Sequence, residues 1–282
     1  MSSPTTLPRT LINGKSCDSL SISDRGLAYG HGLFETIRLS QGRPVLWEQH
    51  MERLQKGCER LGIDVPAQLA SSLMEDVSLF CGLEKEGVIK ITITAGSGGR
   101  GYAAPEVTNT QRIVSLFSLP VYPSDRSEGV KVISCHYQLP LNPRLAGMKH
   151  LNRLDQVLAR AEWQDATIAE GIVCDLNGKV VEGTMSNVFA VKEGVLLTPE
   201  LSQAGVKGIM RDFVLESAAA MGVESREVSL GVDEFKDADE LFLTNSVIGL
   251  WPITQWDDLC FDKGPTTKII QARINRLLTE GV

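Results

Sequence analysis

Apolar residues recur along the chain at two different periods, which separate predicted helices from predicted strands. In the stretch 44–62 they follow the 3.6-residue period of a helix, and Pro44 suits the first turn of that helix. The stretches 68–81, 209–221 and 266–278 are predicted as three further helices.

Short runs rich in β-branched residues predict strands between these helices. Single strands are expected to begin at Phe34 and to cover 88–94, 112–119, 130–139 and 241–246. Three hairpins are also predicted, two of them at Asn-Gly pairs, which favour tight turns. Their paired runs are 11–15 with 19–22, 171–176 with 179–183, and 187–191 with 194–198.

A polar, breaker-rich segment at 122–129 is the predicted linker between two domains. It separates a smaller N-terminal domain, 1–121, from a larger C-terminal domain, 130–282. A chain of 282 residues is long enough for two domains that each bury a core.

Composition and charge narrow the class of protein. With 43% hydrophobic and 22% charged residues, and no apolar run near the ~20 residues that span a bilayer, the chain is expected to be soluble and non-membrane. The N-terminus lacks the features of a signal peptide, which predicts a cytoplasmic protein. A net charge of −7 disfavours nucleic acid as a partner. The six cysteines form no C-x-x-C pair and the four histidines no metal-like spacing, so no metal site is expected.

Lys149 is the first candidate for chemistry. Pro143 and Gly147 break regular structure before it, and an amphipathic helix is expected after it. The apolar residues of that helix are expected to pack against a core; they are Leu151, Leu154, Val157, Leu158 and Ala161. An amine held on such a support is a candidate nucleophile or general base, whereas most lysines are solvated surface charges.

Other segments offer groups for binding an anion, each with a plainer alternative. Gly205 and Gly208 open a predicted helix whose first amide groups would attract an anion, although such glycines often only cap a helix. Arg53 could bind a phosphate with its forked guanidinium, or simply be solvated. The glycines around Tyr29 and His31 indicate either close backbone approach or a turn-rich connection.

A lysine, a carboxylate at the end of a hairpin strand, an arginine and a helix N-terminus are together the groups that pyridoxal phosphate requires. The chain resembles the class IV (fold type IV) pyridoxal-phosphate-dependent aminotransferase family in six segments. These are Asp24-Arg25-Gly26, 29–36, 50–54, Lys149, 182–189 and 205–209. The resemblance implies an α+β fold with a smaller N-terminal α/β domain and a larger C-terminal domain, whose barrel-like sheet is flanked by helices.

The resemblance also implies roles for individual residues. Lys149 is expected to form the Schiff base with the cofactor, and Glu182 to face the pyridine nitrogen. The phosphate and the rest of the cofactor are expected to bind through Arg53, Asn187, Gly208, Ile209, Met210 and Ser246. Two positions depart from the family: His31 stands where many members have Asp, and Met210 replaces a hydroxyl residue that some members use.

Within the family, the segments 98–102 and 149–158 resemble the aminodeoxychorismate lyases. The resemblance implies conversion of 4-amino-4-deoxychorismate to 4-aminobenzoate and pyruvate in folate synthesis, by a homodimer. An aminotransferase for branched-chain or D-amino acids is the alternative, because the cofactor chemistry is shared. A non-catalytic relative is disfavoured, because it would be expected to lack Lys149 or Glu182.

The substrate carries two carboxylates, so arginines must compensate locally in an acidic protein. Arg100, Arg153 and Arg38 are the candidates. The alternative is that these arginines pair with acidic neighbours.

Overall fold

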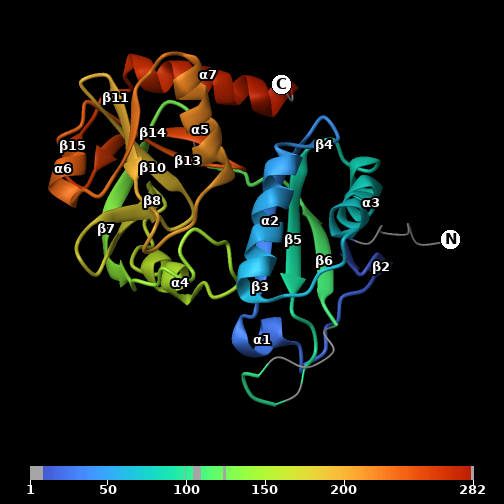
Figure 1. The fold of residues 1–282 in the computed structure, drawn as a ribbon. Coiled ribbons are helices and arrows are strands. Elements are labelled where there is room, and N and C mark those ends of the chain that lie inside the picture. The colour runs from blue at the N-terminus through green and yellow to red at the C-terminus, as the bar shows by residue number, and fades with distance from the viewer. Residues whose placement is uncertain (1–8, 99, 104–108, 123–124, 281–282) are drawn as a thin grey trace. The chain divides into compact units, whose positions relative to one another are not determined.

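The computed structural model describes residues 9–98, 100–103, 109–122 and 125–280. The chain divides into two compact units (Figure 1). Unit 1 contains the described residues up to Pro120 together with Lys149–Asn152, and unit 2 contains Val121–Met148 and the chain from Arg153 onward. Residues 123 and 124 of the predicted linker and residue 99 of the segment 98–102 lie outside the described part of the chain.

Unit 1 is built on an antiparallel sheet with the strand order β2-β1-β6-β5-β3-β4. Its strands are β1 (Thr10–Ile12), β2 (Lys15–Ser16), β3 (Gly32–Ser40), β4 (Arg43–Pro44), β5 (Gly87–Thr94) and β6 (Gln111–Phe117). Its helices are α1 (Arg25–Tyr29), α2 (Trp47–Leu61) and α3 (Leu69–Cys81). Helix α2 packs on β3 and α3 on β6.

The alternation of side chains along β3 decides what reaches the interior of unit 1. Leu33, Glu35, Ile37 and Leu39 are buried at every second position. The period of the strand therefore places one carboxylate, that of Glu35, in a row of apolar side chains.

Unit 2 contains a mixed nine-stranded sheet with the order β12-β11-β10-β13-β14-β7-β8-β9, and β15 pairs with β14. Its strands are β7 (Val130–Leu139), β8 (Ile168–Asp175), β9 (Val180–Gly183), β10 (Asn187–Lys192), β11 (Val195–Pro199), β12 (Ser225–Val228), β13 (Glu240–Asn245), β14 (Gly249–Trp256) and β15 (Leu259–Cys260). Its helices are α4 (Leu154–Arg160), α5 (Ile209–Ala220), α6 (Val232–Lys236) and α7 (Pro265–Glu280). Strand β9 also lies against β10 and β11, so the sheet curls back on itself. This is the barrel-like sheet that the family resemblance implied.

Most predicted elements are confirmed, but two boundaries are wrong. The turn at Asn13-Gly14 is present, with both residues at positive φ, yet the second strand covers only Lys15–Ser16 and not 19–22. Pro44 lies in β4, and α2 begins only at Trp47 because Leu46 adopts a left-handed conformation before it. Sequence reasoning also missed short elements such as α1, α6 and β12.

The expectation that the apolar residues after Lys149 pack against a core is wrong for helix α4. Leu154, Val157 and Leu158 are 74%, 59% and 53% exposed, whereas Ala159 is fully buried. The helix lies on β7 and β8. Its buried side is therefore the one carrying the small Ala159, and the larger apolar residues point away from the strands.

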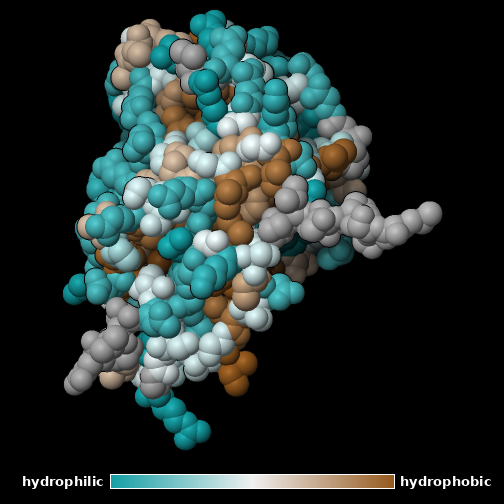
Figure 2. All heavy atoms as spheres, turned by 90° about the vertical axis from the view of Figure 1, so that its right-hand side faces the viewer, coloured by the Kyte–Doolittle hydropathy of each residue, from teal (hydrophilic) through white to brown (hydrophobic). Residues whose placement is uncertain are grey.

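The face of the molecule drawn in Figure 2 is mainly hydrophilic. Figure 2 shows one face on which hydrophobic residues gather in patches between larger hydrophilic areas. Among the described residues, no helix is both long and apolar enough to cross a membrane.

Candidate active site

Lys149 is fixed by backbone pairing with strand β3. The amide of Phe34 donates to the carbonyl of Lys149 at 3.0 Å, and the amide of Leu151 donates to the carbonyl of Gly32 at 3.0 Å. The Lys149 ammonium lies 4.5 Å from the centroid of the Phe34 ring. The same strand residue thus holds the lysine backbone and offers its ring face to the side chain.

Arg53 belongs to a buried network with two residues that sequence reasoning missed. Its Nε donates to Glu35 Oε1 at 2.8 Å, its second amino group donates to Glu35 Oε2, and His50 Nδ1 lies 2.6 Å from Glu35 Oε2. Burial alone would raise the pKa of Glu35, but the charge of Arg53 and the hydrogen bonds from His50 and Arg53 outweigh it and lower the pKa to about 2. Glu35 is therefore a carboxylate at neutral pH.

Glu182 is buried at the end of β9, where the hairpin prediction placed it. Its Oε2 accepts from the amide of Val206 at 2.8 Å, and its Oε1 accepts from Gln156 Nε2 at 3.3 Å. Arg153 also acts on this carboxylate: burial lowers the pKa of Arg153, and the negative charges of Glu182 and Asp155 oppose that shift. All these groups favour the ionised form of Glu182.

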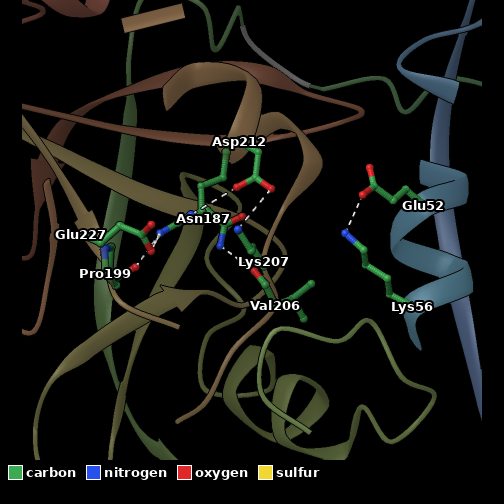
Figure 3. A network of polar contacts seen from close by, with 9 residues as sticks. Glu52, Lys56, Asn187, Pro199, Val206, Lys207, Asp212 and Glu227 are labelled. Atoms are coloured by element: carbon green, nitrogen blue, oxygen red, sulfur yellow. Dashed lines mark hydrogen bonds and ion pairs between the residues drawn. The ribbon is translucent and has the colours of Figure 1, made fainter. Parts of the chain in front are cut away.

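Asn187 also binds the backbone of Val206, through its carbonyl group. Its Nδ2 donates to the carbonyl of Val206 at 2.9 Å (Figure 3). A Cβ atom on Gly208 would lie 2.0 Å from Asn187 Oδ1, so this position requires glycine. The side chains of Glu182 and Asn187 therefore hold the amide and the carbonyl of Val206, two residues before Gly208.

Helix α5 starts directly after Gly208, which caps it without a side-chain hydrogen bond. Ile209 and Met210 are buried in its first turn, where amide groups have no partner within the helix. Lys207 precedes the helix and lies 3.8 Å from Asp212 (Figure 3). This helix start has the amide groups and the partial positive charge that attract anions.

Ser246 lies in the turn that follows β13. Asn245, which sequence reasoning missed, fixes this turn by accepting from the amides of Val247 and Ile248 at 2.8 and 2.9 Å. Its Nδ2 donates to the carbonyl of Met185 at 3.0 Å and so ties the turn to the loop that follows Glu182.

Glu170, a fourth residue that was missed, supports that same loop. It is 1% exposed and accepts hydrogen bonds from the amides of Gly171, Thr184 and Met185 and from the hydroxyls of Thr184 and Ser186. Burial raises its pKa, and these hydrogen bonds oppose the increase. In the segment 182–187, Thr184 and Ser186 thus bind Glu170. Glu182 and Asn187, at the two ends of this segment, bind Val206.

The remaining substrate candidates lie in different surroundings. Arg38 donates to Glu86 Oε2 at 3.4 Å, which is the acidic pairing considered as the alternative. Arg100 is exposed. The loop that follows it is anchored by the buried Arg25, which donates to the carbonyls of Gly101 and Tyr102 at 3.1 and 2.9 Å.

The structure therefore groups the predicted residues in two sets. In unit 1 the charges of Arg53 and Lys149 both act on His50. In unit 2 Glu182, Asn187 and Gly208 surround the Val206 segment. Of the missed residues, Glu35 had a usable signal: it occupies an inward position in an alternating strand.

Comparison with known proteins places this arrangement in a family. The model of amino-transferase class IV matches residues 32–256. The chain belongs to this family. It is 33% identical to an aminodeoxychorismate lyase of Vibrio harveyi over 94% of this chain and 98% of that protein. It is also 32% identical to a putative branched-chain-amino-acid aminotransferase of Methanocaldococcus jannaschii, over 95% of this chain and 96% of that protein.

A solved structure agrees with both the fold and the sequence similarity. The 4-amino-4-deoxychorismate lyase of Pseudomonas aeruginosa superposes with a TM-score of 0.90 and 42% identity, covering 94% of this chain and 98% of that one. The fold type IV architecture predicted from the sequence is thereby confirmed.

Proposed function

We propose that this class IV family member is a pyridoxal-phosphate-dependent lyase that converts 4-amino-4-deoxychorismate to 4-aminobenzoate and pyruvate, a step of folate synthesis. The observation that carries the proposal is the 42% identity over nearly the whole chain to the Pseudomonas aeruginosa lyase. The Vibrio harveyi relative bears the same activity in its name.

The residues of the site fit the cofactor. Glu182 is a buried carboxylate whose ionised form is favoured by the Val206 amide and by the charge of Arg153, which suits a partner for a protonated pyridine nitrogen. No side chain caps the start of α5, so its first amide groups could bind a phosphate. The guanidinium of Arg53 could bind the same group. Lys149 would hold the cofactor covalently, with Asn187, Gly208, Ile209, Met210 and Ser246 as the further binding residues.

When bound, pyridoxal phosphate would supply an electron sink that stabilises negative charge on the substrate carbon bearing the amine. The task of the chain is to move the proton. Once the substrate amine has displaced Lys149 from the cofactor, Lys149 Nζ would be free to act as the general base that removes the proton from this carbon. The bond between the neighbouring carbon and the oxygen of the enolpyruvyl ether would then break, and the oxygen would leave with the electron pair and, after taking up a proton, become pyruvate. The ring that remains is aromatic, and aromatisation drives the elimination. Glu182, whose ionised form is favoured by the Val206 amide, would face the ring nitrogen and favour its protonated form.

The substrate carboxylates require cations in a protein of net charge −7. We propose Arg100 and Arg153 as the residues that bind them, and Arg38 as the third candidate, although Arg38 already pairs with Glu86. Replacing Arg100 and Arg153 separately by Ala should raise KM. Unchanged KM and kcat in both variants would contradict this assignment.

An aminotransferase for branched-chain or D-amino acids is the second candidate. The 32% identity to the putative branched-chain enzyme and the 29% identity to a D-alanine aminotransferase of Bacillus licheniformis support it. In an aminotransferase, Lys149 would move the proton from the substrate carbon to the cofactor. In a lyase, the substrate would instead lose the group on its neighbouring carbon, and which of these happens depends on the substrate.

An absorbance spectrum followed by a substrate test separates these candidates. Purified protein should bind pyridoxal phosphate with a visible band and release pyruvate and 4-aminobenzoate from 4-amino-4-deoxychorismate. A visible band without pyruvate, but with turnover of 2-oxoglutarate and an amino acid, would favour the aminotransferase. Lys149→Ala should lose both the lysine-dependent band and the turnover, and retention of both would contradict its role.

Assembly and location remain predictions from the sequence. The family resemblance favours a homodimer, and the cytoplasmic location is a separate prediction from the sequence. Sedimentation equilibrium of the purified chain would give its mass in solution, and a value near the 30.7 kDa of one chain would contradict the dimer.

A further inference from the structure

The side chains of Glu35, His50 and Arg53 form a network of hydrogen bonds between β3 and α2. Glu35 on β3 is 1% exposed and His50 on α2 is fully buried. Arg53 follows His50 by three residues, so both project from one side of the helix. The carboxylate of Glu35 receives the Arg53 fork on both oxygens and the His50 ring on Oε2.

The protonation states in this network follow from its surroundings. Burial lowers the pKa of His50, the Glu35 carboxylate opposes that shift, and the charges of Arg53 and Lys149 reinforce it. His50 is therefore a neutral ring at neutral pH, and its one proton lies on Nδ1, because Nδ1 faces a carboxylate. Its Nε2 is buried and has no hydrogen-bond partner among the described residues.

A neutral ring in this place adds no charge to the site, but it fixes one oxygen of Glu35. Glu35 in turn fixes the plane of the Arg53 guanidinium, because a two-point fork allows one orientation only. A free arginine side chain loses rotamer entropy when it binds an anion, and an arginine that is already oriented loses less.

We propose that Glu35 and His50 are positioning residues, which orient Arg53 for a phosphate group. The inference rests on the proposed function in one respect, that Arg53 binds the phosphate of the cofactor. It adds that the carboxylate and the imidazole behind Arg53 determine how tightly that phosphate is bound. His50 acts only through its Nδ1–H, by way of Glu35.

His50 is the residue to replace, because its neutral ring leaves the charge of the site unchanged. Asparagine can place an amide donor near the position of Nδ1, whereas glutamine places its amide near the position of Nε2. His50→Ala is expected to lose affinity for pyridoxal 5′-phosphate. If His50 acts as a donor to Glu35, His50→Asn should keep that affinity, and His50→Gln should not. His136→Ala serves as the matched control, because His136 is exposed.

The measurement compares two ligands that differ only in the phosphate. The full-length chain, freed of bound aldehyde, is titrated with pyridoxal 5′-phosphate and with pyridoxal, and binding is followed by absorbance. In His50→Ala the affinity for pyridoxal phosphate should fall at least about tenfold, or ~1.4 kcal/mol. The affinity for pyridoxal should change less than about twofold. His136→Ala should resemble the wild type for both ligands.

Each other outcome overturns the inference in a distinguishable way. Equal losses for both ligands would show a merely structural role, and rescue by glutamine instead of asparagine would assign the role to Nε2. If Arg53→Ala leaves the preference for the phosphorylated ligand intact, Arg53 is not the phosphate residue and the inference fails, although the cofactor assignment stands. A wild-type chain that binds neither ligand would instead contradict the proposed function. Urea unfolding of each variant verifies that it is folded before it is titrated.

Discussion

Glu35 in unit 1 and Glu170 in unit 2 are both 1% exposed, yet their pKa values shift in opposite directions. Glu35 faces a guanidinium and an imidazole, and Glu170 faces three backbone amides and two hydroxyls. Both lose water, which favours the neutral acid. A full positive charge at 2.8 Å more than compensates for that loss, whereas dipoles compensate for it only in part.

The difference separates two kinds of support for the site. The charged network of unit 1 contains a group with a proposed binding role, Arg53 itself. The network around Glu170 contains no such group, but it fixes the loop between Glu182 and Asn187. A close approach in that loop shows how tightly it is held: a Cβ on Gly183 would lie 2.4 Å from Ser186 Oγ and 2.9 Å from Glu170 Cγ.

The largest expected effect comes from removing the charge of Glu35. Glu35→Gln should lower the free energy of unfolding at pH 7 by roughly 3 kcal/mol, because a decrease in pKa from 4.5 to about 2 measures what the ionised form gains on folding. Urea unfolding followed by tryptophan fluorescence gives this value. If the free energy of unfolding decreases no more than it does when an exposed glutamate is replaced by glutamine, Arg53 and His50 do not stabilise the Glu35 carboxylate.

Acid should weaken the wild type through the same residue. Because the pKa of Glu35 is lower in the folded chain, its contribution is complete above pH 4.5 and is lost as the pH falls toward 2. Between pH 6 and pH 3 this residue alone should account for a decrease of about 2 kcal/mol in the free energy of unfolding. The free energy of unfolding should therefore decrease less between pH 6 and pH 3 in Glu35→Gln than in the wild type. An equal decrease in the two proteins would contradict the assignment.

Glu170→Gln should lower the free energy of unfolding less than Glu35→Gln does, by about 1–2 kcal/mol. An amide keeps one acceptor oxygen but turns a donor toward groups that themselves donate, from Met185 and Ser186. The penalty is limited because the raised pKa shows that the ionised form of Glu170 is not strongly favoured in the fold. Urea unfolding of this variant beside Glu200→Gln, at an exposed position, measures the difference.

The pH dependence of the Glu170 variant should have the opposite sign to that of Glu35→Gln. A carboxyl with a raised pKa in the folded state adds stability as the pH falls. Removing it should therefore make the protein lose more stability on acidification than the wild type does. A variant that loses less would show that Glu170 behaves like Glu35.

The smallest effect is expected for a third carboxylate, Glu52 on α2. It pairs with Lys56 at 2.5 Å on the surface (Figure 3), and both side chains are exposed. Exposed pairs one helical turn apart contribute little, because water and salt already screen them. Glu52→Gln should unfold at the same urea concentration as the wild type, and a clear decrease would mean that an exposed partner is enough to stabilise a carboxylate.

How far the sequence could predict the site depended on the kind of signal. Lys149, Glu182 and the glycines before α5 could be proposed from the sequence because they stand in local patterns of turn, strand and helix. Gln156 was not found, because its partner Glu182 lies 26 residues away in the sequence. Glu170 was not found, because its partners in the loop lie 14 to 16 residues away and no spacing rule connects them. The helix after Lys149 was predicted correctly, but the side on which it packs was not.

The sequence by itself determined the elements and the family, because the periods of apolar residues, the turn pairs and the motif residues are all local. Only the tertiary structure decided which side chains meet. Glu35, His50 and Arg53 come together because β3 turns every second residue inward and α2 places two residues of one side against that strand. Their pKa values, their orientation and the fixed plane of Arg53 follow from that contact, since burial and charge act through space and not along the chain.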